Sequence, residues 1–429
     1  MQRILSFEQG PPLSGPLRFF LTAPLFLALA ALLLLWQAEA GLASRWAPAT
    51  LALTHLLTLG MLAMAMVGAL LQILPVVAGV EVARPRLTAT VVHLCLAAGT
   101  LLLAAGFVSG QALLFQLALP LLLAGFGWLL AAVLLGMLRA QPAGAAATVT
   151  AIRLALVSLL LTAGLGAALA SVFAWGVALP VMLLTDLHAA WGLLGWVGLL
   201  VIGVAYQVIP MFQVTPQYPR RVTAWLAWAA FALLAAWSAL SAAGIGGRWP
   251  GVPLAAAFGG FAALTLYLLA KRKRPKPDVT TLFWALAMAS LLLGALLYCL
   301  PPHLFGEAQP LLLGILFIVG FAASAVNGML YKIVPFLVWY HLQSVPGLER
   351  KAVPNVRQIV GERAALLQFG LHFAGCALLA AAVAGPAALA RPAAFLLAVS
   401  ACQLGVNPAG AARLYRRLCA GAGSALVTA

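Results

Sequence analysis

Charged residues are scarce in this chain, and that scarcity gives the first indication of its class. Asp, Glu, Lys and Arg make up 7% of the 429 residues, whereas hydrophobic residues make up 65%. A soluble domain usually carries about 25% charged residues. The mean hydropathy is +1.09. The composition therefore excludes a soluble protein and indicates an integral membrane protein.

Several motifs that would mark other classes of protein are also missing. The five cysteines form no C-x-x-C pair, which argues against a disulfide framework and against a covalently attached c-type haem. The sequence has no Walker motif, Gly-rich dinucleotide loop, nucleophile elbow or metalloprotease helix, so nucleotide-dependent and hydrolytic enzymes are not expected. Residues 1–17 lack an apolar core, so we expect no cleavable signal peptide.

Long apolar runs fill most of the chain. A membrane-spanning helix needs roughly 20 apolar residues, and the sequence offers about twelve such runs. The short alternating strands of a membrane barrel are missing. We therefore predict an all-α polytopic membrane protein with a single membrane domain, residues 1–429. The runs lie near residues 18–38, 50–78, 87–108, 111–138, 147–173, 179–212, 222–244, 251–270, 280–300, 308–340, 364–385 and 393–412.

The basic residues predict the orientation of these spans. If the N-terminus is inside, Arg45, Arg248 and Arg391 are the only members of the 24 Lys and Arg on the outer side. Because basic residues concentrate in cytoplasmic loops, we expect both termini in the cytoplasm. We expect the membrane itself to be a bacterial inner membrane. The net charge of +16 then reflects topology and contact with anionic lipid, and we expect no nucleic-acid partner.

One pattern occurs three times at fixed spacing. Two glycines, a long polar residue and a proline recur after offsets of 135 and 260 residues. Repetition at a fixed offset indicates a repeated architecture, and small residues let helices approach closely in lipid. The pattern therefore predicts that each of these helices packs closely against a neighbouring helix at its glycines. The three copies are GMLAMAMVGALLQILP from Gly60, GWVGLLVIGVAYQVIP from Gly195 and GFAASAVNGMLYKIVP from Gly320.

The three copies fall on the second, sixth and tenth predicted spans. These spans run in the same direction, so the repeat unit is four helices, and the repeats are parallel rather than inverted. We predict three four-helix units, residues 18–140, 145–272 and 279–417, arranged with pseudo-threefold symmetry.

Twelve helices in three parallel groups of four resemble subunit I of the haem–copper oxidase superfamily. The segments GPLRFFLTAPLFLALAALLLLW and THLLTLG also resemble the NnrS family, haem- and copper-containing membrane proteins linked to nitric-oxide stress. The resemblance covers the whole chain in topology but is specific only around spans one, two and six. It implies a cytochrome c oxidase subunit I-like fold, a b-type haem, copper as a candidate second metal, and electron transfer or nitric-oxide and oxygen redox chemistry.

Most of the six histidines lie within predicted spans, where an ionisable side chain is costly and points to function. The superfamily has a haem-ligand histidine in the outer part of its second helix, so the resemblance makes His55 the haem ligand. It makes His372 on span eleven the candidate opposite ligand and His188 on span six a candidate copper ligand. His93 is a further candidate metal ligand. The alternative for each is a histidine packed against a neighbouring helix.

The repeat equivalent of His55 is Ala190 rather than His188. A shift of two residues rotates a side chain by about 200° around the helix. We therefore expect His55 and His188 to face different sites. Asp186 is predicted on the face that corresponds to His55, where it would bind a proton or cation, orient a ligand, or be solvated. Lys332 replaces the glutamine of the repeated pattern, and we expect it to extend to the lipid headgroups.

The catalytic residues of the oxidases are missing. Span ten, residues 308–340, has no histidine; residues 221–247 have none; and Ala189 follows His188, where the superfamily has proline. We therefore predict a haem-binding protein without a complete binuclear centre and, if it is an enzyme, a haem-dependent oxidoreductase. Its partners would be the lipid bilayer and a redox partner or membrane subunits. Two alternatives stay open: a cofactor-free transporter or channel with Asp186 and Lys332 in its pathway, and a structural subunit of a membrane complex.

Overall fold

Twelve helices in the described residues are long and apolar enough to cross a membrane. The structure is a computed structural model that describes residues 12–139, 145–245, 247–306 and 308–428. All regular elements in these ranges are helical. The prediction of an all-α polytopic membrane protein is therefore confirmed. The expectation about a signal peptide concerns residues 1–17, of which the structure describes 12–17. The first predicted unit ends at Ala140, which lies outside the described residues.

Three of the twelve spans combine α-helices with π-helical segments. The second span contains α2 (Pro48–His55), η3 (Leu56–Ala63), α3 (Met64–Ile73) and η4 (Leu74–Ala78); the sixth contains α7 (Val181–Ala190), η5 (Trp191–Gly198) and α8 (Leu199–Gln213); the tenth contains α12 (Ala308–Ile315), η8 (Leu316–Ala323) and α13 (Ser324–Leu342). The other spans are α1 (Ser14–Gln37), α4 (Pro85–Ser109), α5 (Ala112–Arg139), α6 (Ala146–Trp175), α9 (Arg220–Ala242), α10 (Val252–Ala270), α11 (Val279–Cys299), α15 (Glu362–Ala382) and α16 (Pro386–Thr428).

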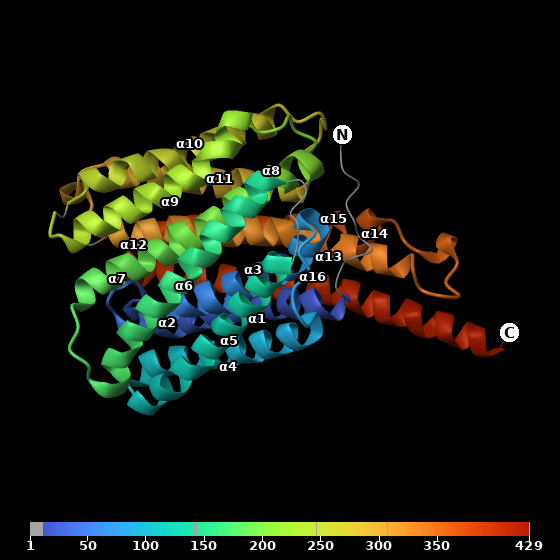
Figure 1. Cartoon of the computed structure of the whole chain (residues 1–429), viewed down its shortest axis with the longest axis horizontal. Helices are drawn as coiled ribbons and strands as arrows, with labels where there is room; N and C mark the ends of the chain where they lie inside the picture. The colour runs from blue at the N-terminus through green and yellow to red at the C-terminus, as the bar shows by residue number, and fades with distance from the viewer. Residues whose placement is uncertain (1–11, 140–144, 246, 307, 429) are drawn as a thin grey trace.

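The spans lie side by side in one bundle, roughly along the horizontal direction of Figure 1. Successive spans pack together, as in the pairs α4 and α5, α5 and α6, and α10 and α11. The first span, α1, also packs against the last, α16, which brings the two ends of the chain's membrane part together. Helix α16 continues beyond the bundle at the right of Figure 1, beside the connection from α13 to α15.

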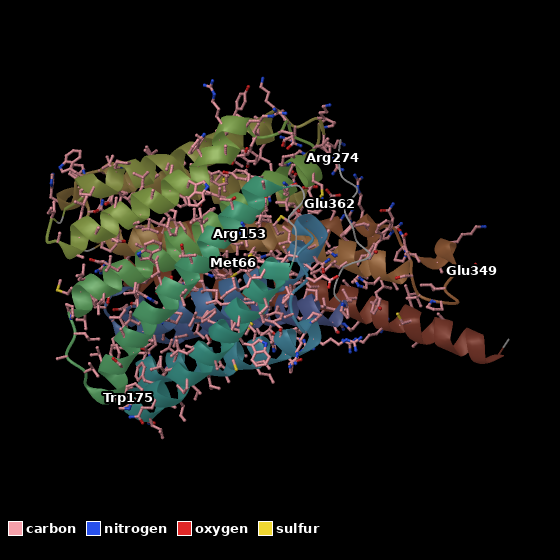
Figure 2. All side chains as sticks on the ribbon, viewed as in Figure 1. Met66, Arg153, Trp175, Arg274, Glu349 and Glu362 are labelled. Atoms are coloured by element: carbon pink, nitrogen blue, oxygen red, sulfur yellow. The ribbon has the colours of Figure 1, made fainter. Side chains whose placement is uncertain are left out.

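Charged residues mark the end of the bundle at which α16 protrudes. Figure 2 labels Arg274, Glu349 and Glu362 at this end, whereas Trp175 lies at the opposite end. The opposite end contains the start of α2 and α7 and the end of α6 (Figure 1). We call these the α16 end and the α7 end of the bundle.

The glycines of the repeated pattern lie where two helices approach most closely. A Cβ atom added at the first glycine of each copy would lie 2.7 Å from a Cβ atom of the neighbouring helix. Real side chains essentially never come this close, so glycine permits the contact. The partner residues are themselves 132 residues apart at each step. The pairs are Gly60 with Phe26, Gly195 with Ser158, and Gly320 with Ser290.

The second glycine of each copy makes a matching contact one step farther along the same helices. A Cβ atom there would lie 2.6–2.8 Å from a Cβ atom of the same partner helix, and the partner residues are again 132 residues apart. The pairs are Gly68 with Phe19, Gly203 with Ala151, and Gly328 with Phe283.

The second, sixth and tenth spans also share a change of helix type. Each becomes π-helical for eight residues, in η3, η5 and η8. These segments begin at Leu56, Trp191 and Leu316, which are related by the offsets of the repeated pattern, 135 and 260. Segment η8 contacts both η3 and η5. π-Helix is rare in proteins, and where it occurs it often lies near a functional site. The residues beside the three segments are therefore candidates for function.

The glycine contact at Gly203 gives a prediction about stability. Ala151 has a single methyl group that cannot rotate away, so Gly203→Ala forces α6 and α8 apart, at a cost of about 1–3 kcal/mol. We expect the midpoint of thermal unfolding in detergent to fall by several degrees. Gly164→Ala on α6 is the matched control, because its Cβ would meet no atom within 4 Å. Equal midpoints for the two variants would contradict the packing role.

Candidate functional site

A large cavity lies among the spans at the α7 end of the bundle. Its volume is about 940 Å³, near the upper limit of the ~300–1,000 Å³ that is typical of ligand-binding pockets. Most of the side chains that line it are apolar and come from α1, α2, α6, α7, α11 and η8. The polar exceptions include two histidines and one ion pair.

His55 and His188 meet in this cavity. Their ring centres are 6.2 Å apart and their planes differ by 20°, and both side chains line the cavity. The expectation that the two histidines face different sites is therefore wrong. The shift of two residues does place them on different faces of their helices, but two neighbouring helices bring residues together only when each presents the face that points toward the other.

Each histidine binds a backbone carbonyl through Nδ1. His55 donates from Nδ1 to the carbonyl oxygen of Leu51 at 2.7 Å, and His188 donates from Nδ1 to that of Thr162 at 3.0 Å. A proton on Nδ1 leaves a lone pair on Nε2, and neither Nε2 has a hydrogen-bond partner among residues 12–139, 145–245, 247–306 and 308–428. Metal-bound histidines use their second nitrogen in this way, so both rings are prepared to bind a metal through Nε2.

Two further residues hold the rings in place. The ring of Phe107 on α4 stacks on that of His55, with centres 5.2 Å apart and planes 29° apart. On the other side, Gly166 of α6 faces His188, and a Cβ atom there would lie 2.9 Å from Cε1 of the imidazole. Sequence reasoning missed both residues, because a phenylalanine and a glycine in apolar spans carry no signal of their own.

His372 lies elsewhere, buried between α13 and α15. Its Nε2 is 2.9 Å from Oγ of Ser324 and 3.4 Å from Sγ of Cys376, and its Nδ1 is 3.4 Å from Nδ2 of Asn327. Both ring nitrogens therefore have polar neighbours, and His372 does not line the cavity. The structure brings His55 together with His188 and not with His372, the opposite ligand expected from the resemblance.

His93 is also separate from the cavity. On α4, its Nε2 lies 2.8 Å from Oγ1 of Thr22, which in turn donates to the carbonyl of Arg18. The ring packs edge-on against Phe19, with centres 5.2 Å apart. In the part of the chain that the structure describes, no group of three or more His, Cys, Asp or Glu residues could hold a metal ion. His93 therefore lies in a contact between α1 and α4. It belongs to no candidate metal-binding group among the described residues.

Asp186 faces the same cavity as the two histidines, and it is paired there. Nη2 of Arg45 lies 2.6 Å from Oδ1 of Asp186, and the guanidinium lies over the ring of Trp46, 4.4 Å from its centre. Arg45 and Asp186 are 141 residues apart in sequence. Sequence reasoning therefore identified the carboxylate but not its partner.

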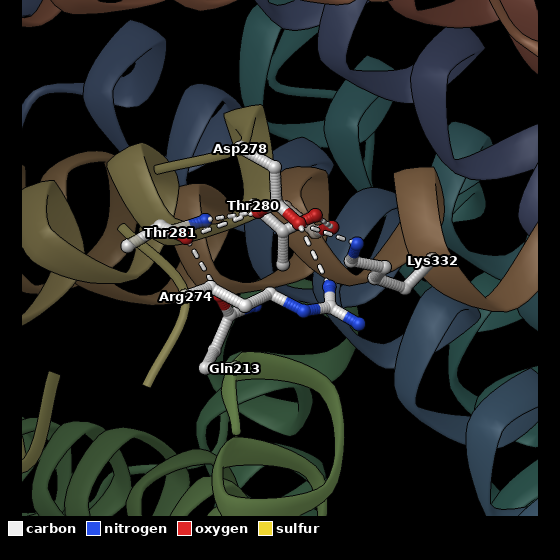
Figure 3. A network of polar contacts seen from close by, with 7 residues as sticks. Gln213, Arg274, Asp278, Thr280, Thr281 and Lys332 are labelled. Carbon is white, nitrogen blue, oxygen red and sulfur yellow. Dashed lines mark hydrogen bonds and ion pairs between the residues drawn. The ribbon is translucent and has the colours of Figure 1, made fainter. Parts of the chain in front are cut away.

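Lys332 forms an ion pair with Asp278, the residue before α11 (Figure 3). Its Nζ lies 2.6 Å from Oδ2 of Asp278, while Oδ1 of Asp278 accepts from the backbone N–H of Thr281 at 2.9 Å and caps α11. The Thr281 hydroxyl donates to Oε1 of Gln213 at 2.6 Å. The expectation that Lys332 extends to lipid headgroups is therefore wrong, because a carboxylate lies within its reach.

The environment of Asp278 favours its charged form. Burial acts to raise the pKa of this carboxyl, but the hydrogen bond and charge of Lys332, together with the hydrogen bonds from Thr281, outweigh it and hold the pKa below its usual range. The ion pair is therefore intact at neutral pH.

Comparison with protein-family models found no matching family, and comparison with curated proteins found no match either. The resemblance to haem–copper oxidase subunit I and to NnrS therefore stays a prediction. The features that bear directly on function are the histidine pair and the cavity around it.

The ion pair of Asp278 and Lys332 can be tested by a double-mutant cycle. Asp278→Asn leaves the Lys332 charge partly buried without its partner, so we expect a loss of about 1–3 kcal/mol and a lower thermal midpoint. Lys332→Gln restores the residue that the repeated pattern has at Gln72 and Gln207. The double variant should unfold at a higher temperature than Asp278→Asn alone. A double variant as unstable as the sum of both single variants would show that the pair does not interact.

The lowered pKa of Asp278 also predicts how stability changes with pH. A carboxyl whose folded-state pKa is lowered contributes stability that is fully present above its ordinary pKa, ~3.9, and is lost as the pH falls through the folded-state value. We therefore expect the difference in thermal midpoint between the wild type and Asp278→Asn to be constant near neutral pH and to shrink below about pH 4. A difference that persists unchanged in acid would contradict the ionic origin.

Proposed function

We propose that this protein is a haem-binding membrane protein in which His55 and His188 hold one b-type haem. The observation that carries the proposal is the pair of imidazoles, each with Nδ1 fixed by a carbonyl and Nε2 left to bind. The 6.2 Å between the ring centres places the two imidazoles close enough to bind the same metal ion, each through its Nε2 at the ~2.0–2.1 Å of a metal–nitrogen bond.

The surroundings favour a haem over a bare metal ion. A bare zinc or copper ion usually takes three or four protein ligands, and the described residues offer no group of three His, Cys, Asp or Glu. A haem iron receives four nitrogens from the porphyrin, so two histidines complete its coordination. The apolar walls and the volume of about 940 Å³ suit a large flat macrocycle. These findings support His188 as a haem ligand in place of a separate copper ligand.

A haem held by two histidines supplies one-electron chemistry without an open position for a gas ligand. The protein's own contribution is to keep both Nε2 lone pairs available, through the carbonyls of Leu51 and Thr162, and to surround the site with apolar side chains. Electron transfer is therefore the function that this site supports best, and any enzymatic activity would be that of a haem-dependent oxidoreductase. A redox partner or a further membrane subunit would supply or accept the electron.

The proposal extends to the architecture. Three four-helix units in an oxidase subunit I-like arrangement explain why the sequence pattern and the π-helical segments share the offsets 135 and 260. They also explain why both sets of glycine contacts recur with partners 132 residues apart. The distribution of basic residues supports an orientation with both termini, and hence the α16 end, in the cytoplasm. The membrane would be a bacterial inner membrane.

The test is a visible spectrum of the protein purified in mild detergent, before and after reduction with dithionite. We expect a Soret band and sharp reduced α and β bands that are lost in His55→Ala and in His188→Ala. His372→Ala is the matched control and should keep them, because His372 lies outside the cavity. A colourless wild type would overturn the proposal in favour of a cofactor-free transporter or a structural subunit. Loss of the bands in His372→Ala but not in His188→Ala would overturn the ligand assignment.

A further inference from the structure

The cavity that contains His55 and His188 has a charged region in its wall. Arg45 and Asp186 both line it and pair through a single contact, Nη2 to Oδ1 at 2.6 Å. Their side chains keep 35% and 44% of their surface exposed, so a ligand in the cavity can reach both. The other described residues that line the cavity include no Lys, Arg, Asp or Glu.

The charged region lies close to the histidine pair. Asp186 precedes His188 by two residues on α7, which separates them by about 3 Å along the helix axis. Arg45 precedes α2, the helix that ends at His55. The two segments that supply the ligating nitrogens therefore also supply the two charges, and both charges lie toward the α7 end of the bundle.

The guanidinium of Arg45 has capacity that Asp186 does not use. An arginine has five N–H donors in a planar fork that matches both oxygens of a carboxylate. Only one nitrogen of Arg45, Nη2, contacts Asp186, through Oδ1. The guanidinium also lies over the ring of Trp46, 4.4 Å from its centre. A second carboxylate that approached this plane would compete with Asp186, because like charges repel at such short range.

We propose that Arg45 binds the carboxylate end of the ligand that fills the cavity, and that this carboxylate displaces Asp186. The ligand class is an amphiphile with a large apolar body and an anionic edge. The inference rests on the proposed function, in which the carboxylates are the two propionates of a b-type haem. A long-chain fatty acid has the same chemistry and is the other source of such a group. In either case Arg45 orients the ligand, and Asp186 weakens its binding.

The experiment compares two forms of one macrocycle. The purified apoprotein is titrated with haem and with haem dimethyl ester, in which both carboxylates are methylated, and the dissociation constant is taken from the Soret band. We expect the wild type to bind haem about tenfold more tightly than the ester, which corresponds to the free energy of one charge-assisted contact. Arg45→Gln should remove this preference by weakening the binding of haem and not that of the ester. Asp186→Asn should strengthen the binding of haem alone.

The matched control is Arg391→Gln, which removes an exposed arginine at the start of α16 that does not line the cavity. It should keep the wild-type preference. Equal binding of haem and ester by the wild type would overturn the proposal without any variant, so a variant that fails to fold cannot leave the question open. An unchanged preference in Arg45→Gln would also overturn it.

A failure of the proposed function would look different. If no macrocycle binds, or if binding is unaffected in His55→Ala and His188→Ala, the haem assignment fails, and Arg45 is tested with a fluorescent long-chain fatty acid and its methyl ester. Preference for the acid that is lost in Arg45→Gln would support a carboxylate site for a fatty acid. Equal binding of the acid and the ester would overturn the role of Arg45 for this ligand class as well.

Discussion

The close approach of helices at the repeated glycines determines where this bundle is tight and where it is open. At Gly60, Gly195 and Gly320 the neighbouring backbones are so near that a Cβ atom would overlap a partner side chain. The cavity begins beside this level, since Trp196 and Val319 are among the residues that line it. The glycine contacts thus limit the cavity toward the α16 end. They also fix how far along the bundle axis the histidines of α2 and α7 lie from the closely packed part.

The change to π-helix follows closely after the histidines, and the first glycine of each repeated pattern lies inside the π-helical segment. Helix α2 ends at His55, and η3 begins at the next residue; helix α7 ends two residues after His188, and η5 follows. A π-helical turn contains an extra residue and turns the following side chains relative to those before it. The first packing glycine and the cavity-facing histidine can therefore face different directions on the same span, although they are only five positions apart on the second span and seven on the sixth.

The sequence was sufficient to predict features that belong to a single helix, such as its position in the chain and its ionisable residues. Apolar runs identified all twelve spans. The cost of an imidazole in lipid drew attention to His55, His93, His188 and His372 alike, and the resemblance singled out His55 and His188 as ligands on the second and sixth spans. Contacts between helices were less accessible, because a helical face is defined relative to its own axis and says nothing about where the neighbouring helix lies. For this reason the approach of His55 to His188, the pairing of Arg45 with Asp186 and that of Lys332 with Asp278 all needed the structure. The neighbours of His372 on α13 were hidden for the same reason.

The two histidines differ in which helix controls them. His55 is held by the carbonyl of Leu51 within its own helix, so its ring moves with α2. His188 is held by the carbonyl of Thr162 and lies against Gly166, both on α6, so its ring moves with α6 rather than with α7 alone. A relative displacement of α2 and α6 would therefore widen or narrow the 6.2 Å between the ring centres. The distance between the two imidazoles therefore depends on the separation of α2 and α6, and a group bound to both rings would hold these two spans at a fixed separation.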